Sequence, residues 1–171
     1  MKKIAVLILA AVIFTCVFCS CGQLPFSETN ETNKTDKTET LTEEDKSIIK
    51  QTMSDELLIL EINNDTLDIC FNTLALYRST GLYSDAQIQE QYNKCSGQYK
   101  EVLKQAEKVI NYYNDYPDLF TDIKTAIDEL TVFYNSQGNS FDEQLMRDNS
   151  KIISSWNTQY SDDFKKLTSG N

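Results

Sequence analysis

The sequence predicts an all-α fold, an up-down-up-down four-helix bundle that follows a disordered N-terminal tether. Three observations support this fold class. Beyond residue 42, apolar residues recur every three or four positions, which is the period of an amphipathic helix. Only five Gly and two Pro occur in 171 residues, too few for the turns of a β-sandwich of this size. Hydrophobic residues make up 40% of the chain, which is enough to form a core.

The first helix is predicted over residues 43–79. The pattern Thr42-x-x-Asp45 suits a capping box at its start, and Gly81 is a typical C-terminal signal. Two apolar stripes run along this helix, and the second is expected to widen the buried face. The first stripe comprises Ile49, Met53, Leu57, Leu60, Asn64, Leu67, Phe71 and Leu74. The second stripe comprises Ile48, Ile59, Ile62, Ile69 and Leu76.

The second helix is predicted over residues 84–115, where Ser84-x-x-Gln87 again has the pattern of a capping box. It carries the most regular heptad repeat in the chain, so these residues are expected to face the core. The repeat comprises Ile88, Tyr92, Cys95, Tyr99, Val102, Ala106, Val109 and Tyr113.

The third and fourth helices are predicted over residues 117–136 and 140–168. Pro117 suits the first position of the third helix, Gly138 ends it, and Ser140-x-x-Glu143 would cap the fourth. The third apolar stripe comprises Phe120, Ile123, Ile127, Leu130 and Phe133 or Tyr134. The fourth comprises Phe141, Leu145, Ile152, Trp156, Tyr160, Phe164 and Leu167. Short connections make sequential helices antiparallel. A three-helix arrangement, or a kink at Asn63-Asn64, is the alternative.

Charge narrows the range of partners. The formal net charge is −10, and residues 1–20 contribute two lysines and no acid, so the remainder is more acidic still. Nucleic-acid binding requires clustered Lys and Arg, so no nucleic-acid partner is expected. An acidic domain is also repelled by anionic lipid, so attachment to a membrane would have to be covalent.

Residues 1–20 are predicted to be an export signal. Lys2 and Lys3 precede an apolar run at residues 4–18. This run is shorter than the ~17 residues that a spanning helix requires, and the pattern is typical of a signal peptide.

The stretch FCSCG at residues 18–22 resembles a lipobox, the motif of bacterial lipoproteins in which a small residue precedes the lipidated cysteine. The resemblance covers residues 1–22 only. It implies that Cys21 receives the lipid and anchors the protein at the extracytoplasmic face of the cell membrane. Phe18 stands where Leu is usual in the motif, and Cys16 and Cys19 are rival sites.

The segment at residues 21–42 is predicted to be a disordered linker between the lipidated cysteine and the helical domain at residues 43–171. It is rich in Thr, Glu, Asn and Lys and has few apolar residues. Such a composition buries too little apolar surface to offset the entropy of ordering.

Two cysteines fall within the predicted helices. Cys70 and Cys95 lie at equal distances from the first turn, so they should lie at the same height in an antiparallel hairpin. An exported protein meets oxidising conditions, which favours a Cys70–Cys95 disulfide. The alternative is that both are free thiols packed as small apolar residues.

The end of the first hairpin is the candidate partner-binding region. Counting residues from each predicted turn places the loop near Gly138 level with Cys70 and Cys95. Residues 71–92 would then project about 15 Å past the other helices, at ~1.5 Å per residue. Tyr77, Leu82 and Tyr83 are the candidate contact residues. The alternative is that longer third and fourth helices cover them.

The residue types present favour binding over catalysis. The chain has no His, and no nucleophile–base set, phosphate loop, metal-ligand cluster or cofactor motif can be assembled. The expected function is a non-enzymatic lipoprotein that binds a protein or cell-wall polymer. The alternative is a receptor with a small-ligand cavity. Its candidate lining residues are Asn64, Tyr92, Tyr99 and Tyr113.

Overall fold

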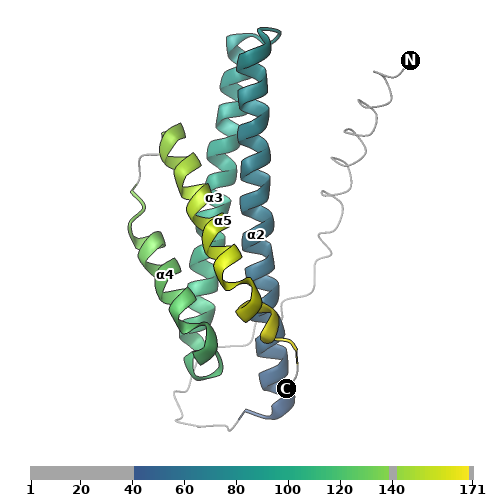
Figure 1. Ribbon diagram of the computed structural model, residues 1–171, viewed down its shortest axis with the longest axis vertical. Helices are drawn as coiled ribbons and strands as arrows, with labels where there is room; N and C mark the ends of the chain where they lie inside the picture. The colour runs from purple at the N-terminus through teal and green to yellow at the C-terminus, as the bar shows by residue number, and fades with distance from the viewer. Residues whose placement is uncertain (1–40, 139–141, 170–171) are drawn as a thin grey trace, which may run out of the picture. The chain divides into compact units, whose positions relative to one another are not determined.

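The computed structural model describes residues 41–138 and 142–169, and these residues form four α-helices and two short 3₁₀ turns (Figure 1). No strand occurs in these two ranges, so the prediction of an all-helical fold is confirmed for them. The predicted signal, the lipidation of Cys21 and most of the predicted linker lie outside the described residues.

The first two helices begin and end within a residue of their predicted bounds. Helix α2 spans Glu43–Thr80 and α3 spans Asp85–Asp115. Each has the predicted capping box, in which Thr42 and Ser84 accept from the amide three residues on. Gly81 ends α2 at φ 65°, a left-handed conformation that favours glycine. Helix α2 continues through Asn63-Asn64 without interruption.

The third helix is shorter than predicted, and its predicted start is wrong. The 3₁₀ turns η1 (Pro117–Leu119) and η2 (Thr121–Ile123) precede α4, which spans only Lys124–Asn135. Phe120, between the two turns, has φ −124° and ψ 28°, outside the helical region. Its ring is fully buried and lies against Tyr112 and Tyr113 of α3. The chain therefore leaves the helical path where it buries Phe120.

The fourth helix, α5, spans Glu143–Lys166, and Asp142 rather than Ser140 is its N-cap. The Asp142 carboxylate accepts from the Leu145 amide at 2.8 Å; Ser140 and Phe141 lie outside the described residues. The predicted stripe of this helix is wrong in its first half, because Leu145 is 37% exposed and Ile152 is 50% exposed. The buried residues there are their neighbours Met146 and Ile153, one position further on.

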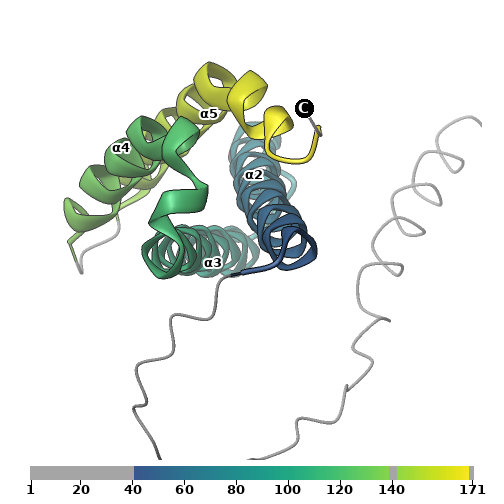
Figure 2. The same ribbon diagram turned by 90° about the horizontal axis from the view of Figure 1, so that it is seen from below.

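Helix α2 packs along α3 and against α5, and α4 packs on α3 and more sparingly on α5. Figure 2 shows the four helices in the order α2, α3, α4, α5 around a common centre. Fully buried side chains come from all four helices and from the turn before α4. They include Met53, Leu60, Phe71, Tyr99, Phe120, Leu130, Met146 and Ile153.

A ladder of side-chain hydrogen bonds fixes the register of α2 against α3. Its donors on α3 and its acceptor carbonyls on α2 both recur every seven residues. The bonds are Gln91 to Cys70 (3.0 Å), Gln98 to Asn63 (3.0 Å), Gln105 to Glu56 (2.9 Å) and Tyr112 to Ile49 (3.3 Å). We call this set the glutamine ladder. Every pair sums to the same residue number, as an antiparallel pair in one constant register requires.

The second apolar stripe of α2 is exposed, which contradicts the prediction that it widens the buried face. We call these five residues the outer stripe. Their exposed fractions are Ile48 59%, Ile59 40%, Ile62 53%, Ile69 64% and Leu76 55%. Helix α2 packs against α3 and α5 only on its inner side, so its outer side remains in solvent. Within residues 41–138 and 142–169, no helix is long and apolar enough to cross a membrane.

Candidate functional site

The end of α2 and the turn that follows it carry an apolar group that we call the tip: the exposed Leu82 and the partly buried Tyr77 and Tyr83. Figure 1 shows both helices of the hairpin continuing beyond the N-terminal end of α5. Leu82 is 82% exposed, the highest value among the large exposed hydrophobic residues of the described chain. The rings of Tyr77 and Tyr83 stack with centroids 3.7 Å apart and planes 6° apart. The stack joins the last turn of α2 to the connection that precedes α3, and Leu82 takes no part in it.

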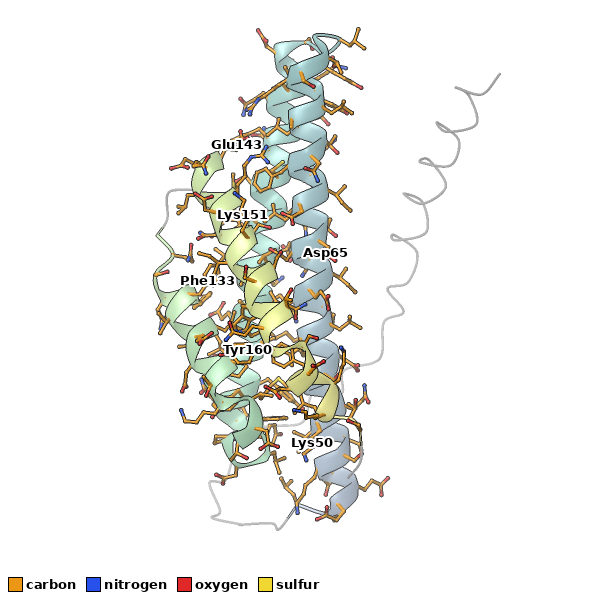
Figure 3. The ribbon with its side chains drawn as sticks, in the orientation of Figure 1. Lys50, Asp65, Phe133, Glu143, Lys151 and Tyr160 are labelled. Carbon is orange, nitrogen blue, oxygen red and sulfur yellow. The ribbon has the colours of Figure 1, made fainter. Side chains whose placement is uncertain are left out.

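A charged cluster at the start of α5 contacts α2 near the tip. The Glu143 carboxylate receives hydrogen bonds from Arg78 at 2.7 Å and from Arg147 at 3.0 Å. Burial raises the pKa of Glu143, but these two guanidinium groups overcome that effect and lower it. Arg147 also lies over the Phe71 ring, 4.4 Å from its centroid. Figure 3 places Glu143 at the end of α5 beside the hairpin. Leu82 and Tyr83 follow Arg78 of this cluster in the chain, in the turn beyond the end of α2.

Asn64 lies in a buried polar layer between α2 and α5, and its side chain is 2% exposed. Its amide donates to the Ser150 carbonyl at 3.2 Å and to Ser154 Oγ at 2.8 Å. The Ser150 hydroxyl lies 3.1 Å from Asn64 Oδ1 and 2.6 Å from Asp68 Oδ1, and its single hydrogen is shared between these two acceptors. Donors and acceptors are thus used within the protein, as expected of a residue that fixes the height of one helix against another.

The three candidate ligand tyrosines lie apart from Asn64. Tyr99 is fully buried, and its hydroxyl donates to Gln137 Oε1 at 2.8 Å and accepts from Asn149 at 2.6 Å. Tyr113 is buried beside the Phe120 ring, and Tyr92 is partly buried against the core. These residues are spread along α3 and do not converge on one point.

Three surface hollows of about 340, 410 and 440 Å³ occur over the described helices. The first lies between α4 and α5, with Phe133 and Trp156 in its wall; the others lie along α3 and at its junction with α4. None of the three is lined by Asn64, Tyr92, Tyr99 or Tyr113. The volumes are in the range of ligand pockets, but such pockets enclose most of their ligand, and these hollows are open.

Cys70 and Cys95 are free cysteines in the structure, so the predicted disulfide is not formed in it. Their side chains nevertheless meet in a hydrogen bond, with Cys95 buried and Cys70 partly buried. This bond lowers the pKa of Cys70 to about 7, with Lys94 adding to the effect and burial opposing it. The same bond, with burial, raises the pKa of Cys95. The Cys70 thiol therefore loses its proton near neutral pH, whereas the Cys95 thiol keeps its proton.

Alkylation of Cys70 by iodoacetamide should follow this pKa, because the thiolate is the reactive form. We expect its rate in the folded chain to rise with a midpoint at about pH 7 and to level off above about pH 8. Cys95 should react only after unfolding. Peptide-level mass spectrometry separates the two from the other cysteines. In Cys95→Ala the Cys70 midpoint should move upward, because the stabilising hydrogen bond is lost; equal labelling of both cysteines at every pH would contradict the assignment.

Among the residues that the structure describes, no group of three or more His, Cys, Asp or Glu is placed to hold a metal ion. Comparison of the chain with protein families, curated proteins and solved structures finds no match.

Sequence reasoning overlooked the glutamine ladder and the Arg78–Glu143–Arg147 cluster. The ladder had a visible signal, because Gln91, Gln98 and Gln105 are seven residues apart. Within the cluster, Glu143 and Arg147 also had one, because they are four residues apart on one helix. Arg78 had none, since it lies on a helix far away in the sequence.

Proposed function

We propose that this chain is a bacterial lipoprotein in which Cys21 carries the lipid and the helical domain is a non-enzymatic interaction module outside the cell membrane. The FCSCG stretch at residues 18–22 and the preceding apolar run support the anchor. The acidic composition supports it indirectly, since the domain has little means of binding an anionic membrane by charge.

We further propose that the four helices form an up-down-up-down bundle. The glutamine ladder supports an antiparallel α2 and α3. Contacts of Tyr99 with Gln137 and of Tyr113 with Phe120 support the same relation between α3 and α4. Contacts between α5 and α2 support an antiparallel relation there too. Glu143, at the start of α5, pairs with Arg78 near the end of α2, and Ser150, further along α5, contacts Asn64, which comes earlier in α2. An up-down bundle with one elongated hairpin presents that hairpin's turn as its free end.

The observation that carries the proposed function is the exposure of Leu82 beside the Tyr77–Tyr83 stack. Aromatic residues are enriched among those that dominate binding energy, and a stacked pair is already ordered before a partner arrives. A leucine that is 82% exposed at a turn gains most of its burial only when another molecule covers it. The partner is a protein or a cell-wall polymer.

A photocrosslinking residue placed at Leu82 in the full chain should give one discrete adduct in intact cells. Val132, which is 71% exposed on α4, is the matched control position and should give none. Tyr83→Ala should reduce the Leu82 adduct several-fold, because the stack that presents the leucine is lost. Digestion by a protease or by a cell-wall hydrolase then distinguishes the two partner classes. Equal adducts at both positions, or unchanged capture by Tyr83→Ala, would count against the tip.

The anchor is tested in the same cells. Cys21→Ala should move the chain out of the membrane fraction and abolish its labelling by radioactive palmitate. A Cys21→Ala chain that keeps both its label and its membrane association would contradict lipidation at this residue.

A further inference from the structure

The outer stripe of α2 has the spacing of a coiled-coil seam. Ile62, Ile69 and Leu76 follow one another at intervals of seven residues, and Ile48 lies two intervals before Ile62; the position between Ile48 and Ile62 is Asp55, so the seam carries one acid among its apolar residues. The positions between them, four residues after one member and three before the next, are Thr52, Ile59, Thr66 and Thr73. An α-helix has 3.6 residues per turn, so a strict seven-residue apolar repeat stays on one line only when a second helix coils around it.

The threonines of this seam can be covered without cost in hydrogen bonds. Each donates its hydroxyl to the helix's own carbonyl four residues back: Thr52 at 2.9 Å, Thr66 at 2.8 Å and Thr73 at 2.9 Å. A buried hydroxyl is unfavourable when it loses its partner, and these keep theirs inside α2. Isolated exposed apolar residues are ordinary on a protein surface, whereas five that recur along one face of a single helix indicate an interaction surface.

The charges in and beside the seam are of one sign, and one of them, Asp55, occupies a seam position. Between Lys50 and Arg78, α2 carries five acidic residues and no basic one. Glu56 is paired with Lys108, and Asp68 accepts from Ser150. The other three, Asp55, Glu61 and Asp65, are exposed and have no ion pair with any residue in the described ranges. Figure 3 labels Asp65 midway along α2, above Lys50.

The pKa of Asp65 responds to desolvation and to the negative charges near it. This pKa is raised, first by partial burial and then by the nearby carboxylates Glu61 and Asp68. No cation of the described chain relieves the repulsion. A partner that brings positive charge alongside the seam would do so, and it would gain favourable contacts with all three exposed acids.

We propose that the outer stripe docks a basic amphipathic helix of a partner protein. The partner's apolar residues fill the line of Ile48, Ile59, Ile62, Ile69 and Leu76, and its Lys or Arg side chains face Asp55, Glu61 and Asp65. A second copy of this chain would place acids against acids, and an anionic bilayer would be repelled. The surface runs along the side of α2 and ends at Leu76, next to the tip, but it shares no residue with the tip. It therefore adds to the proposed function a second contact that does not depend on Leu82.

The test uses the full chain in nanodiscs of neutral phosphatidylcholine, with empty nanodiscs as a blank. The probe is a labelled synthetic helix of about four heptads with Ile and Leu at its seam positions and Lys at the flanking ones. An otherwise identical helix with Glu in place of Lys is the charge control. By fluorescence anisotropy, we expect the Lys probe to bind at least about tenfold more tightly than the Glu probe, and its affinity to fall as salt is added.

Two sets of variants locate the binding. Ile62→Ser with Ile69→Ser should weaken the Lys probe about tenfold or more, whereas Val132→Ser with Ile152→Ser, changed at comparably exposed positions, should not. A triple variant should bind the Lys and Glu probes with nearly equal affinity; its changes are Asp55→Asn, Glu61→Gln and Asp65→Asn. These substitutions leave the apolar residues of the outer stripe unchanged. Circular dichroism checks that each variant is folded.

Other outcomes overturn the inference. Equal affinity for both probes, or unchanged binding by Ile62→Ser with Ile69→Ser, would exclude a basic helix on this face. A concentration-dependent dimer of the chain that competes with the probe would assign the face to a second copy instead. Leu82→Ser should bind the probe as wild type does, so failure of the tip and failure of the outer stripe are separate results.

Discussion

Replacing Leu60 by Ala should lower the free energy of unfolding by about 2–5 kcal/mol, because a fully buried side chain leaves a cavity that its neighbours fill only in part. The same change at Leu58, two residues away, should alter it by less than about 0.5 kcal/mol. Leu58 is 54% exposed, on the side of α2 that no other described helix covers. The two substitutions share residue type, helix and helix propensity, so the difference between them reports burial alone.

Urea unfolding of the full chain, followed by far-ultraviolet circular dichroism, measures both changes. The slope of the free energy with urea should be the same in both variants. A comparable loss in Leu58→Ala would mean that the outer side of α2 is covered in the folded chain, contrary to the structure. A small loss in Leu60→Ala would mean that α2 and α3 are loosely packed where the structure places the core.

Local signals explain why the first two helices could be predicted closely. Thr42 with Asp45, Ser84 with Gln87, and Gly81 each act within a few residues, and a capping box or a left-handed glycine has the same effect in any fold. The buried line of α3 also follows from its own heptad repeat.

Tertiary packing explains where prediction failed. The start of α4 depends on Phe120, whose burial against α3 outweighs the helical preference of the surrounding residues. The outer stripe has the same periodicity as a buried stripe, because periodicity shows that a face is apolar and does not show how many neighbours cover it. In α5, the predicted core residue Leu145 is exposed, and its neighbour Met146 is buried instead.

In the candidate site, too, some features follow from local sequence and others depend on tertiary packing. The turn at Gly81 and equal spacing placed Cys70 near Cys95 and put Leu82 at the end of the hairpin. Residue spacing carries no information on oxidation, and the structure has two free thiols. Asn64 is visible in the sequence as a polar residue within an apolar stripe, but its partners, Ser150 and Ser154, lie 86 and 90 positions away.

Asn64→Asp should be among the most damaging single changes, with a loss of about 3–5 kcal/mol at neutral pH. The aspartate would have no amide hydrogens to donate to Ser150 and Ser154, which the asparagine now contacts at 3.2 and 2.8 Å. It would also place a buried negative charge in the layer that already holds Asp68, joined through the Ser150 hydroxyl. Both effects follow from the exchange of one nitrogen for one oxygen, with no change in size.

The pH dependence of Asn64→Asp distinguishes charge from lost hydrogen bonds. Burial and Asp68 should raise the folded-state pKa of the new carboxyl above its unfolded value of about 3.9. Between these two pKa values the folded state binds more protons than the unfolded state, so the variant loses stability as pH rises and regains it as pH falls. The difference from wild type, measured by urea unfolding at each pH, should therefore shrink toward about pH 4.

Asn64→Leu is the matched control. It also removes the hydrogen bonds but introduces no charge, so we expect a loss of about 1–3 kcal/mol that does not vary with pH. If Asn64→Asp matched Asn64→Leu at every pH, the layer would be hydrated and the new charge screened by solvent. A loss that instead grows as pH falls would have the wrong sign for a buried carboxylate, and Asn64 could not then lie in the closed layer between α2 and α5.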